Sequence, residues 1–264
     1  MSLTKVTFSM VNGAPANPLD FGAIGDGLTD DTQAIQDALD SGANIVDGCG
    51  LTYATTSQLT MTAGTVLQNI TIQMADSNYA GLVYASNCVL DNVTVLGTSR
   101  VNQYPSAQIG ISDSANSTNV TVNATAKYCN INFNLNGTTL SNFDIISNNA
   151  SGQSGVSEGY GCLLYQSASR NNINLRAVSC ARHALYISSG SSENTCNVHS
   201  VGTLYGFSVQ INSRIDQPIC SGNVITGSDY YSAGGVVFSQ DATANPDTGG
   251  AIQNNICRDF EVYA

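Results

Sequence analysis

A repeat of 22 or 23 residues runs through most of the chain and limits the fold more than any other feature of the sequence. Seven segments align in one series: GLVYA, QIGIS, NINFN, CLLYQ, ALYIS, GFSVQ and GVVFS. Their two core columns are Leu82, Ile109, Ile131, Leu163, Leu185, Phe207, Val236 and, two residues later, Tyr84, Ile111, Phe133, Tyr165, Ile187, Val209, Phe238. Every member of both columns is apolar or Tyr, whereas the residue between them follows no rule. This period of two predicts β-strands with one face always buried.

A second series of strands interleaves with the first. It comprises NITIQ, NVTVL, NVTVN, NFDII, NINLR and TCNVH. Its buried columns are Ile70, Val93, Val120, Phe143, Ile173, Cys196 and then Ile72, Val95, Val122, Ile145, Leu175, Val198. Each repeat thus holds two or three short strands and no helix, so it must stack on its neighbours to bury its apolar face.

These observations favour a parallel β-helix over two alternatives. A leucine-rich repeat has a similar period but needs a Leu/Asn consensus that is absent here. A β-sandwich would not keep the same columns apolar through seven successive turns. In a β-helix each repeat is one rung, and equivalent residues stack about 4.8 Å apart. We expect an all-β solenoid of about seven to eight rungs over residues 51–264.

The composition excludes several classes of partner. Only 10% of the 264 residues are charged, against about 25% in ordinary globular proteins, and the net charge is -11. Nucleic-acid binding requires clustered Lys and Arg, so it is not expected. No apolar run is long enough to span a bilayer, and MSLTKVTFSM lacks a signal-peptide core, so we expect neither membrane insertion nor secretion. The eight cysteines contain no C-x-x-C pair and match no zinc signature, so we expect reduced thiols, no metal and no cofactor.

The acidic stretch DFGAIGDGLTDDTQAIQDAL precedes the repeats, from Asp20 to Leu39. Gly25, Asp26 and Gly27 predict a tight turn, and Asp30 is a candidate N-cap for a helix that begins at Asp31. Gln33 would complete a capping box, and the apolar stripe of the helix would be Ala34, Ile35, Ala38 and Leu39. Such a helix would cover the open end of the coil, whose first rung otherwise presents unpaired strand edges.

The segment NPLDFGAIGDGLTDDTQAIQDAL resembles the N-terminal motif of the pectin-lyase-like, pectate-lyase-3 type right-handed β-helix superfamily. With the leading TKVTFSMVNGAPANPLDFGA it is similar to the segment that introduces the β-helix of bacteriophage tailspike and tail-fibre proteins. The resemblance implies a right-handed coil and a homotrimer. We expect an extended connector over residues 1–19, a capping segment over 20–50 and the β-helix over 51–264.

Candidate functional residues gather on the outward face of the second strand series. Charged side chains appear there only in the middle rungs, and the long insertion from Ser147 to Gly161 leaves the same corner. The expected groove would combine the candidate catalytic pair Asp144 and Glu158 with Arg176, His199, Asn174 and Asn197. By contrast, the aligned segments of the first series carry no carboxylate on their outward face, which we expect to be a subunit contact or inert.

Two chemistries fit these residues. Paired carboxylates hydrolyse glycosidic bonds, whereas an Arg and a His beside them could neutralise a uronate and remove its proton. Alternatively, Asp144 and Arg176 form an ion pair between rungs, and His199 and Glu158 are ordinary surface groups. Tyr186, Tyr230 and Tyr231 could stack on sugar rings, or they could be packing residues.

The resemblance implies a phage tailspike or tail-fibre receptor-binding protein that recognises polysaccharide on the bacterial host. Two alternatives remain open: a depolymerase of the same fold, acting as a glycoside hydrolase or lyase, and a non-catalytic structural spike. Tailspike depolymerases share no short catalytic motif, so the sequence leaves the enzymatic activity undecided. The expected location is the virion tail, attached to other tail proteins, after synthesis in the host cytoplasm.

Overall fold

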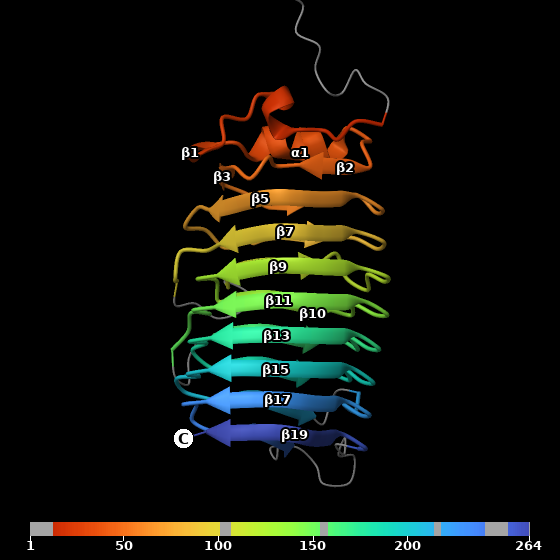
Figure 1. Ribbon diagram of the computed structural model, residues 1–264, viewed down its shortest axis with the longest axis vertical. Helices are drawn as coiled ribbons and strands as arrows, with labels where there is room; N and C mark the ends of the chain where they lie inside the picture. The colour runs from red at the N-terminus through yellow and green to blue at the C-terminus, as the bar shows by residue number, and fades with distance from the viewer. Residues whose placement is uncertain (1–12, 101–106, 154–157, 214–217, 241–252, 264) are drawn as a thin grey trace, which may run out of the picture.

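The computed structural model is a right-handed parallel β-helix whose rungs stack along the long axis of the molecule (Figure 1). It describes residues 13–100, 107–153, 158–213, 218–240 and 253–263. All strand pairs are parallel and form two sheets. We call the sheet that faces the viewer in Figure 1 the front sheet and the other one the back sheet.

The front sheet contains eleven strands, in the order β1-β3-β5-β7-β9-β11-β13-β15-β17-β19 with β2 pairing β5. Their bounds are β1 Asp26–Asp30, β2 Ile45–Asp47, β3 Thr52–Thr55, β5 Val66–Met74, β7 Val89–Leu96, β9 Thr121–Lys127, β11 Asn142–Asn148, β13 Asn172–Val178, β15 Thr195–Val201, β17 Val224–Tyr230 and β19 Ile256–Tyr263.

The back sheet contains eight strands, one from each of eight rungs. They are β4 Leu59–Thr60, β6 Ala80–Tyr84, β8 Ile109–Asp113, β10 Ile131–Asn136, β12 Tyr160–Tyr165, β14 His183–Ser188, β16 Val209–Ser213 and β18 Val236–Gln240. The predicted solenoid of seven to eight rungs is confirmed.

The core lies between the two sheets. All twelve residues of the predicted front columns are buried, with exposures of 3% or less. Strand β9 pairs two residues away from the predicted alignment, since Val122 and not Val120 lies beside Phe143. A shift by two residues keeps the same side chains pointing inward, so the residues predicted for the core remain buried despite the change in register.

The back columns are only partly confirmed. Leu82, Ile111, Phe133, Leu185 and Val209 occupy one inward column, with Cys162 between Phe133 and Leu185. The prediction was wrong for Leu163, Tyr165 and Ile109, which are only partly buried and line a surface groove. Ile131 lines the same groove but is buried, with 2% exposure. Phe207 and Phe238 are 38% and 41% exposed, so their predicted burial was also wrong.

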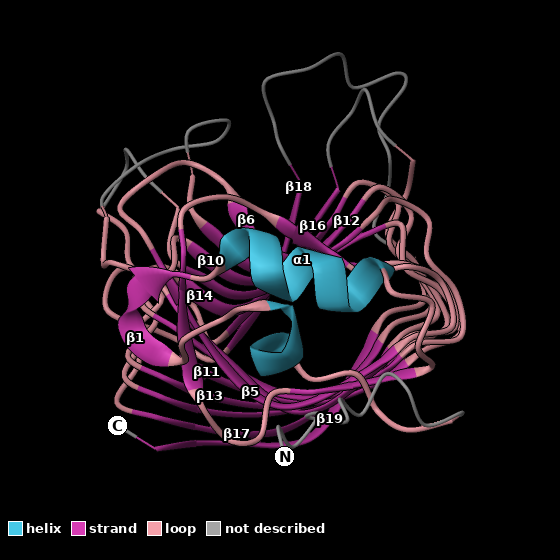
Figure 2. Cartoon of the chain, turned by 90° about the horizontal axis from the view of Figure 1, so that it is seen from above, coloured by secondary structure: helices cyan, strands magenta, loops and turns pink. Residues whose placement is uncertain are grey.

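Within the described residues one α-helix, α1 from Thr32 to Asp40, crosses the N-terminal end of the coil (Figure 2). It buries the predicted stripe of Ile35, Ala38 and Leu39 against the first rungs, with Ala34 partly buried. A short 3-10 helix, Pro18–Phe21, precedes it. The helix therefore covers the apolar end of the solenoid, as expected for a terminal cap.

The start of α1 differs from the prediction. The helix begins one residue later than expected, with Asp31 at the N-cap position. The buried Asp31 carboxylate does not cap the helix; it accepts the backbone N–H groups of Ile24 and Gly25, at 2.7 and 2.9 Å. Asp30 accepts from Thr32, and Gln33 donates forward to Asp37, so no capping box forms. Asp26 and Gly27, expected to form a tight turn with Gly25, instead begin β1, which already belongs to the front sheet.

All eight cysteines are free thiols, six of them buried and two, Cys49 and Cys257, exposed. Burial raises the pKa of the Cys180 thiol to about 11 and that of the Cys196 thiol to about 12. The buried thiols therefore behave as small apolar core groups. Among the described residues, no helix has the length and apolar character needed to cross a membrane.

Candidate functional site

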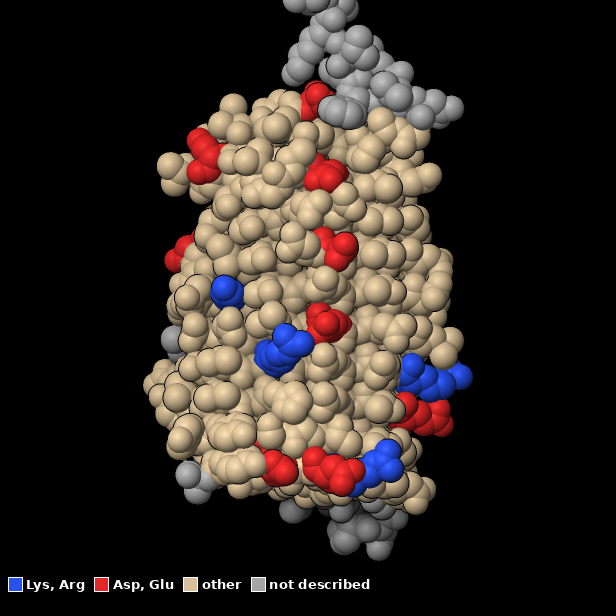
Figure 3. Space-filling model, viewed as in Figure 1, with Lys and Arg blue, Asp and Glu red and all other residues tan. Residues whose placement is uncertain are grey.

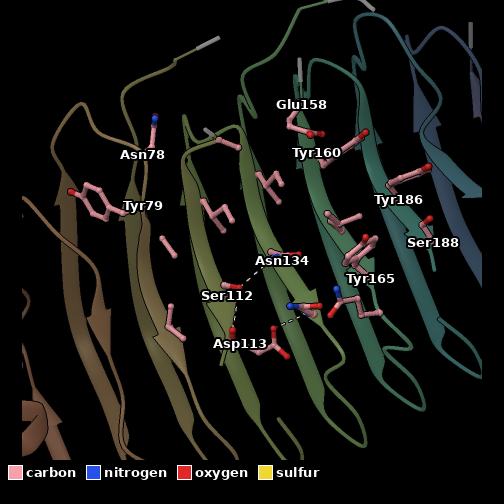
Figure 4. A pocket seen from close by; sticks show the side chains of 18 of the residues that line it. Asn78, Tyr79, Ser112, Asp113, Asn134, Glu158, Tyr160, Tyr165, Tyr186 and Ser188 are labelled. Carbon is pink, nitrogen blue, oxygen red and sulfur yellow. Dashed lines mark hydrogen bonds between the residues drawn. The ribbon is translucent and has the colours of Figure 1, made fainter. Parts of the chain in front are cut away.

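The outer face of the back sheet carries a groove of about 820 Å³ (Figure 4). It crosses six strands, from β6 to β16, which at a strand spacing of about 4.8 Å corresponds to a length of roughly 24 Å. Carboxamides supply much of the lining: Gln58, Asn78, Asn134, Asn136, Gln166 and Asn212. Four tyrosines, Tyr79, Tyr160, Tyr165 and Tyr186, also line it. The charged groups among the described lining residues are Asp113, Glu158 and Arg182.

The register of each strand determines which side chains face the groove. In β10 the apolar Phe133 and Leu135 point into the core, so Asn134 and Asn136 point outward. In β12 Cys162 and Leu164 point inward, and Leu163 and Tyr165 line the groove.

A glycine sets the path of β12 at its start. Gly161 lies directly before the inward-facing Cys162, and a Cβ there would lie 2.5 Å from the carbonyl oxygen of Ala184. Only glycine allows this close approach of the two strands, beside which Tyr160 lines the groove.

Stacked aromatic rings form a plate at one end of the groove. The ring of Tyr160 lies 5.1 Å from that of Tyr186 and 5.8 Å from that of His183, and His183 lies 6.2 Å from Phe207. The interplanar angles in these pairs are 15°, 5° and 4°. Arg182 donates from Nη1 to the Tyr160 hydroxyl at 2.8 Å, and its guanidinium lies over the same ring. The plate is therefore held rigidly in place before any ligand arrives.

The histidine in this plate is neutral near pH 7. Burial lowers the pKa of His183 to about 4, and the backbone N–H of Phe207 donates to Nδ1 at 3.1 Å. Nδ1 lies just as close to the Phe207 carbonyl oxygen, at 3.0 Å, so these contacts fit either neutral tautomer, and the ring acts as an uncharged stacking group. Burial also raises the pKa of Tyr160, and the adjacent Glu158 carboxylate raises it further.

Asp113 is a buried carboxylate at the other side of the groove (Figure 4). One oxygen accepts the backbone N–H of Asn136 at 2.7 Å, and the other accepts the Thr138 hydroxyl at 2.8 Å. Burial raises the pKa of Asp113 to about 6, although both hydrogen bonds lower it. This carboxyl group can therefore hold or release a proton near neutral pH.

The two groove carboxylates lie too far apart to act as a pair. In the back sheet, Asn134 of β10 lies between Ser112 of β8 and Leu163 of β12. Asp113, the residue after Ser112, is therefore level with Leu164, the residue after Leu163. A rise of about 3.3 Å per residue and a spacing of about 4.8 Å between strands place the backbone positions of Asp113 and Tyr160 roughly 15 Å apart. Glu158 lies beside Tyr160. Paired glycosidase carboxyls are about 5 to 9.5 Å apart, so these two do not form such a pair.

Two carboxamide oxygens on the groove floor have no hydrogen-bond partner among the residues that the structure describes. Asn134 donates through Nδ2 to the Ser112 hydroxyl, but its Oδ1 and the Oδ1 of Asn136 accept no hydrogen bond within the described part of the chain. Both oxygens are buried from solvent, so they are unsatisfied acceptors beneath the groove surface, and such groups are rare in folded proteins.

The candidate catalytic pair predicted from the sequence is not brought together. Asp144 lies on β11, on the outer face of the front sheet, whereas Glu158 lines the back-sheet groove. The expectation that both residues line a single groove is therefore wrong. So is the expectation that the outer face of the first strand series is free of carboxylates, since Asp113 lies at the end of β8 and lines the groove.

The other predicted residues of the front sheet form an exposed polar ladder. Asn174 donates to Asp144 at 3.0 Å, Asn197 donates to Asn174 at 3.2 Å, and Thr226 donates to Asn197 at 3.3 Å. His199 contacts Ser228 at 2.9 Å and Asn197 at 3.3 Å. Arg176 is exposed beside His199, and the described residues hold no ion pair between Asp144 and Arg176. Figure 3 shows that this face is largely uncharged.

The predicted tyrosines separate into two places. Tyr186 lines the groove and accepts from Asn212 at 2.9 Å. Tyr230 belongs to the front sheet and stacks on Tyr263 at 4.4 Å, and Tyr231 follows it with 73% exposure. Of the residues proposed from the sequence, Glu158 and Tyr186 are therefore the two that line the groove.

Residues 23–62 match a protein-family model described as the N terminal extension of bacteriophage endosialidase. The match covers the end of the N-terminal loop, β1, α1 and the first short strands. The resemblance of this segment to phage proteins, predicted from the sequence, is confirmed. A comparison with curated proteins found no match.

Several solved structures have a similar fold. An N-terminal fragment of bacteriophage phi29 gene product 12 aligns with a TM-score of 0.70 and 18% identity, over 92% of this chain and 46% of the fragment. ORF18 of Geobacillus virus E2 aligns with a TM-score of 0.57 and 14% identity, over 86% of this chain and 61% of the other. The enzymatically active domain of tailspike protein 2 from bacteriophage CBA120 aligns with a TM-score of 0.50 and 15% identity, over 86% and 46%.

These similarities show the fold. The chain shares the right-handed β-helix of phage tail proteins and spans about half the length of the solved chains that it resembles.

Proposed function

We propose that this protein is a tailspike-type receptor-binding protein whose back-sheet groove binds polysaccharide on the surface of a bacterial host. The observation that carries the proposal is a continuous groove across six strands, with a carboxamide floor and a rigid aromatic plate. Its length suits an extended chain of several sugar units better than a single small molecule. Carboxamides donate to and accept from sugar hydroxyls, and tyrosine rings offer apolar faces to pyranose rings.

The assembly and location that we propose rest on the similarity to phage tail proteins. The protein would be a component of the virion tail, attached through other tail proteins and assembled as a homotrimer. Sedimentation velocity would measure the trimer directly as a species of three times 27.5 kDa.

Tyr186→Ala is expected to weaken polysaccharide binding about tenfold, because a stacking contact of about 1.4 kcal/mol corresponds to one decade in Kd. The measurement uses the full chain on an array of bacterial O-antigens and capsular polysaccharides, followed by titration of the best ligand. Tyr231→Ala is the matched control, since this tyrosine is exposed and belongs to no part of the groove. Equal losses from both variants, or a loss only from Tyr231→Ala, would place the ligand elsewhere.

A depolymerase is the second candidate, favoured by one observation. The Asp113 carboxyl has a pKa of about 6 and lines the groove, so it could protonate a leaving group or accept a proton. The CBA120 domain of the same fold is described as enzymatically active. Release of reducing ends or unsaturated uronates from a bound polysaccharide, abolished by Asp113→Asn, would establish it. Binding without release identifies an adhesin, and no binding to any glycan identifies a structural spike.

A further inference from the structure

The charges that line the groove are predominantly negative. The described lining residues include two carboxylates, Asp113 and Glu158, and one guanidinium, that of Arg182. Arg182 already donates to the Tyr160 hydroxyl and lies over its ring. The groove therefore offers little cationic charge to an acidic ligand.

The rest of the molecule strengthens this imbalance. The chain carries 19 acidic residues against 8 Lys and Arg, a net charge of -11. Two further arginines are already in ion pairs, Arg100 with Asp76 at 3.1 Å and Arg170 with Glu193 at 3.9 Å. The summed field of such a chain repels anions and slows their approach. Among the described lining residues, Arg182 would be the one cationic partner for a bound uronate or sialate, and it is already engaged with Tyr160.

The neutral part of the lining has the complementary chemistry. Carboxamide groups from six side chains and the hydroxyls of Ser112 and Ser188 line the groove together with the tyrosines. Amides and hydroxyls can both donate and accept hydrogen bonds. They therefore match hydroxyl and N-acetyl groups of a sugar, which likewise donate and accept.

We propose that the glycan held by the back-sheet groove is an uncharged polysaccharide, rich in hydroxyl or N-acetyl groups, and that the groove discriminates against uronate- and sialate-containing polymers. This inference rests on the proposed function and names its ligand class. Discrimination arises from repulsion by Asp113 and Glu158 as much as from attraction by the amides.

The test compares neutral O-polysaccharides with polysialate and polyuronate capsules, as binding to the full chain at low and high salt. We expect the neutral ligand to bind at least tenfold more tightly than any anionic polymer at 20 mM salt. Its affinity should change less than twofold between 20 and 300 mM salt. Residual binding of an anionic polymer should strengthen as salt is added, because screening shortens the reach of the repulsion.

A charge-removing variant isolates the contribution of the groove. Glu158→Gln is expected to raise the affinity for an anionic polymer at least threefold at 20 mM salt. The matched control is Asp144→Asn, which removes one negative charge from the front sheet, outside the groove, and should leave both affinities unchanged. Because both variants change the net charge equally, a difference between them locates the repulsion in the groove.

The outcomes separate this inference from the proposed function. Tight binding of an anionic polymer that weakens as salt is added would overturn the inference and leave a polysaccharide receptor in place. Equal effects of Glu158→Gln and Asp144→Asn would also overturn it, since the repulsion would then belong to the whole molecule. Failure to bind any neutral or anionic glycan would overturn the proposed function and the inference together.

Discussion

Replacing Asn194 by alanine is expected to lower the free energy of unfolding by about 4 kcal/mol, because buried groups that lose a hydrogen-bond partner cost about 1–3 kcal/mol each. Asn171, Asn194, Asn223 and Asn255 stack on successive rungs at one corner of the coil. The Asn194 Oδ1 accepts from both the backbone and the side chain of Asn171, at 3.1 and 3.0 Å. Its Nδ2 donates to Ala168 O and to Asn223 Oδ1, both at 2.9 Å. One substitution therefore breaks four bonds at a site that is completely buried.

The exposed ladder of the front sheet provides the control. Asn174 makes similar contacts between rungs with Asp144 and Asn197, but it lies where water can replace them. Asn174→Ala should therefore cost less than about 1 kcal/mol. Urea unfolding of both variants measures the difference. Similar costs at the two positions would show that burial does not decide the strength of these ladders.

Stability between pH 4 and pH 7 should depend on two buried groups with opposite effects. The pKa of Asp113 is raised to about 6 in the folded chain, so this group stabilises the fold at low pH and loses that effect as the pH rises through 6. The pKa of His183 is lowered to about 4, so this group stabilises the fold near pH 7 and loses that effect as the pH falls toward 4. A change of about two in either pKa corresponds to about 3 kcal/mol in the free energy of unfolding, so the two contributions largely cancel.

Single substitutions should expose each contribution. Relative to the wild type, Asp113→Asn should become more stable by about 3 kcal/mol as the pH rises from 4 to 7. His183→Phe, which keeps the stacked ring, should show the opposite trend and gain relative stability as the pH falls. Urea titrations at several pH values provide the measurement, and differences from the wild type remove the contribution of exposed carboxylates such as Asp26 and Asp30. Parallel pH profiles for the three proteins would show that neither group is desolvated as described.

Hydrophobic alternation was sufficient to predict the fold and most of the core. The sequence predicted correctly which residues of the front sheet point inward, because polar residues such as Asp144 and Asn174 alternate with apolar ones. The alignment at β9 was displaced by two residues, which alternation cannot detect because both registers bury the same face.

The groove was not predicted because one of its central strands, β12, carries apolar or aromatic residues on both faces. In GCLLY, either Cys162 and Leu164 or Leu163 and Tyr165 could point inward, and alternation alone does not decide between them. The choice depends on the close approach of the neighbouring strand at Gly161, where a Cβ would lie 2.5 Å from the carbonyl oxygen of Ala184. Asp113 lies at the end of β8, one residue beyond the aligned segment, and its burial depends on Thr138 and Asn136 from the next rung. The polar outward residues Asn134 and Asn136 were the signal available in the sequence.

The central claim is that polysaccharide binds across the outer face of the back sheet. Hydrogen exchange of backbone amides, measured with and without the tightest neutral polysaccharide from the array, tests this claim most directly. Protection should increase in β8, β10, β12 and β14 and in the segments that border the groove, and should be unchanged in β11, β13 and β15 of the front sheet. Protection confined to the front sheet, around Asp144 and His199, would contradict the account and restore the site first expected from the sequence.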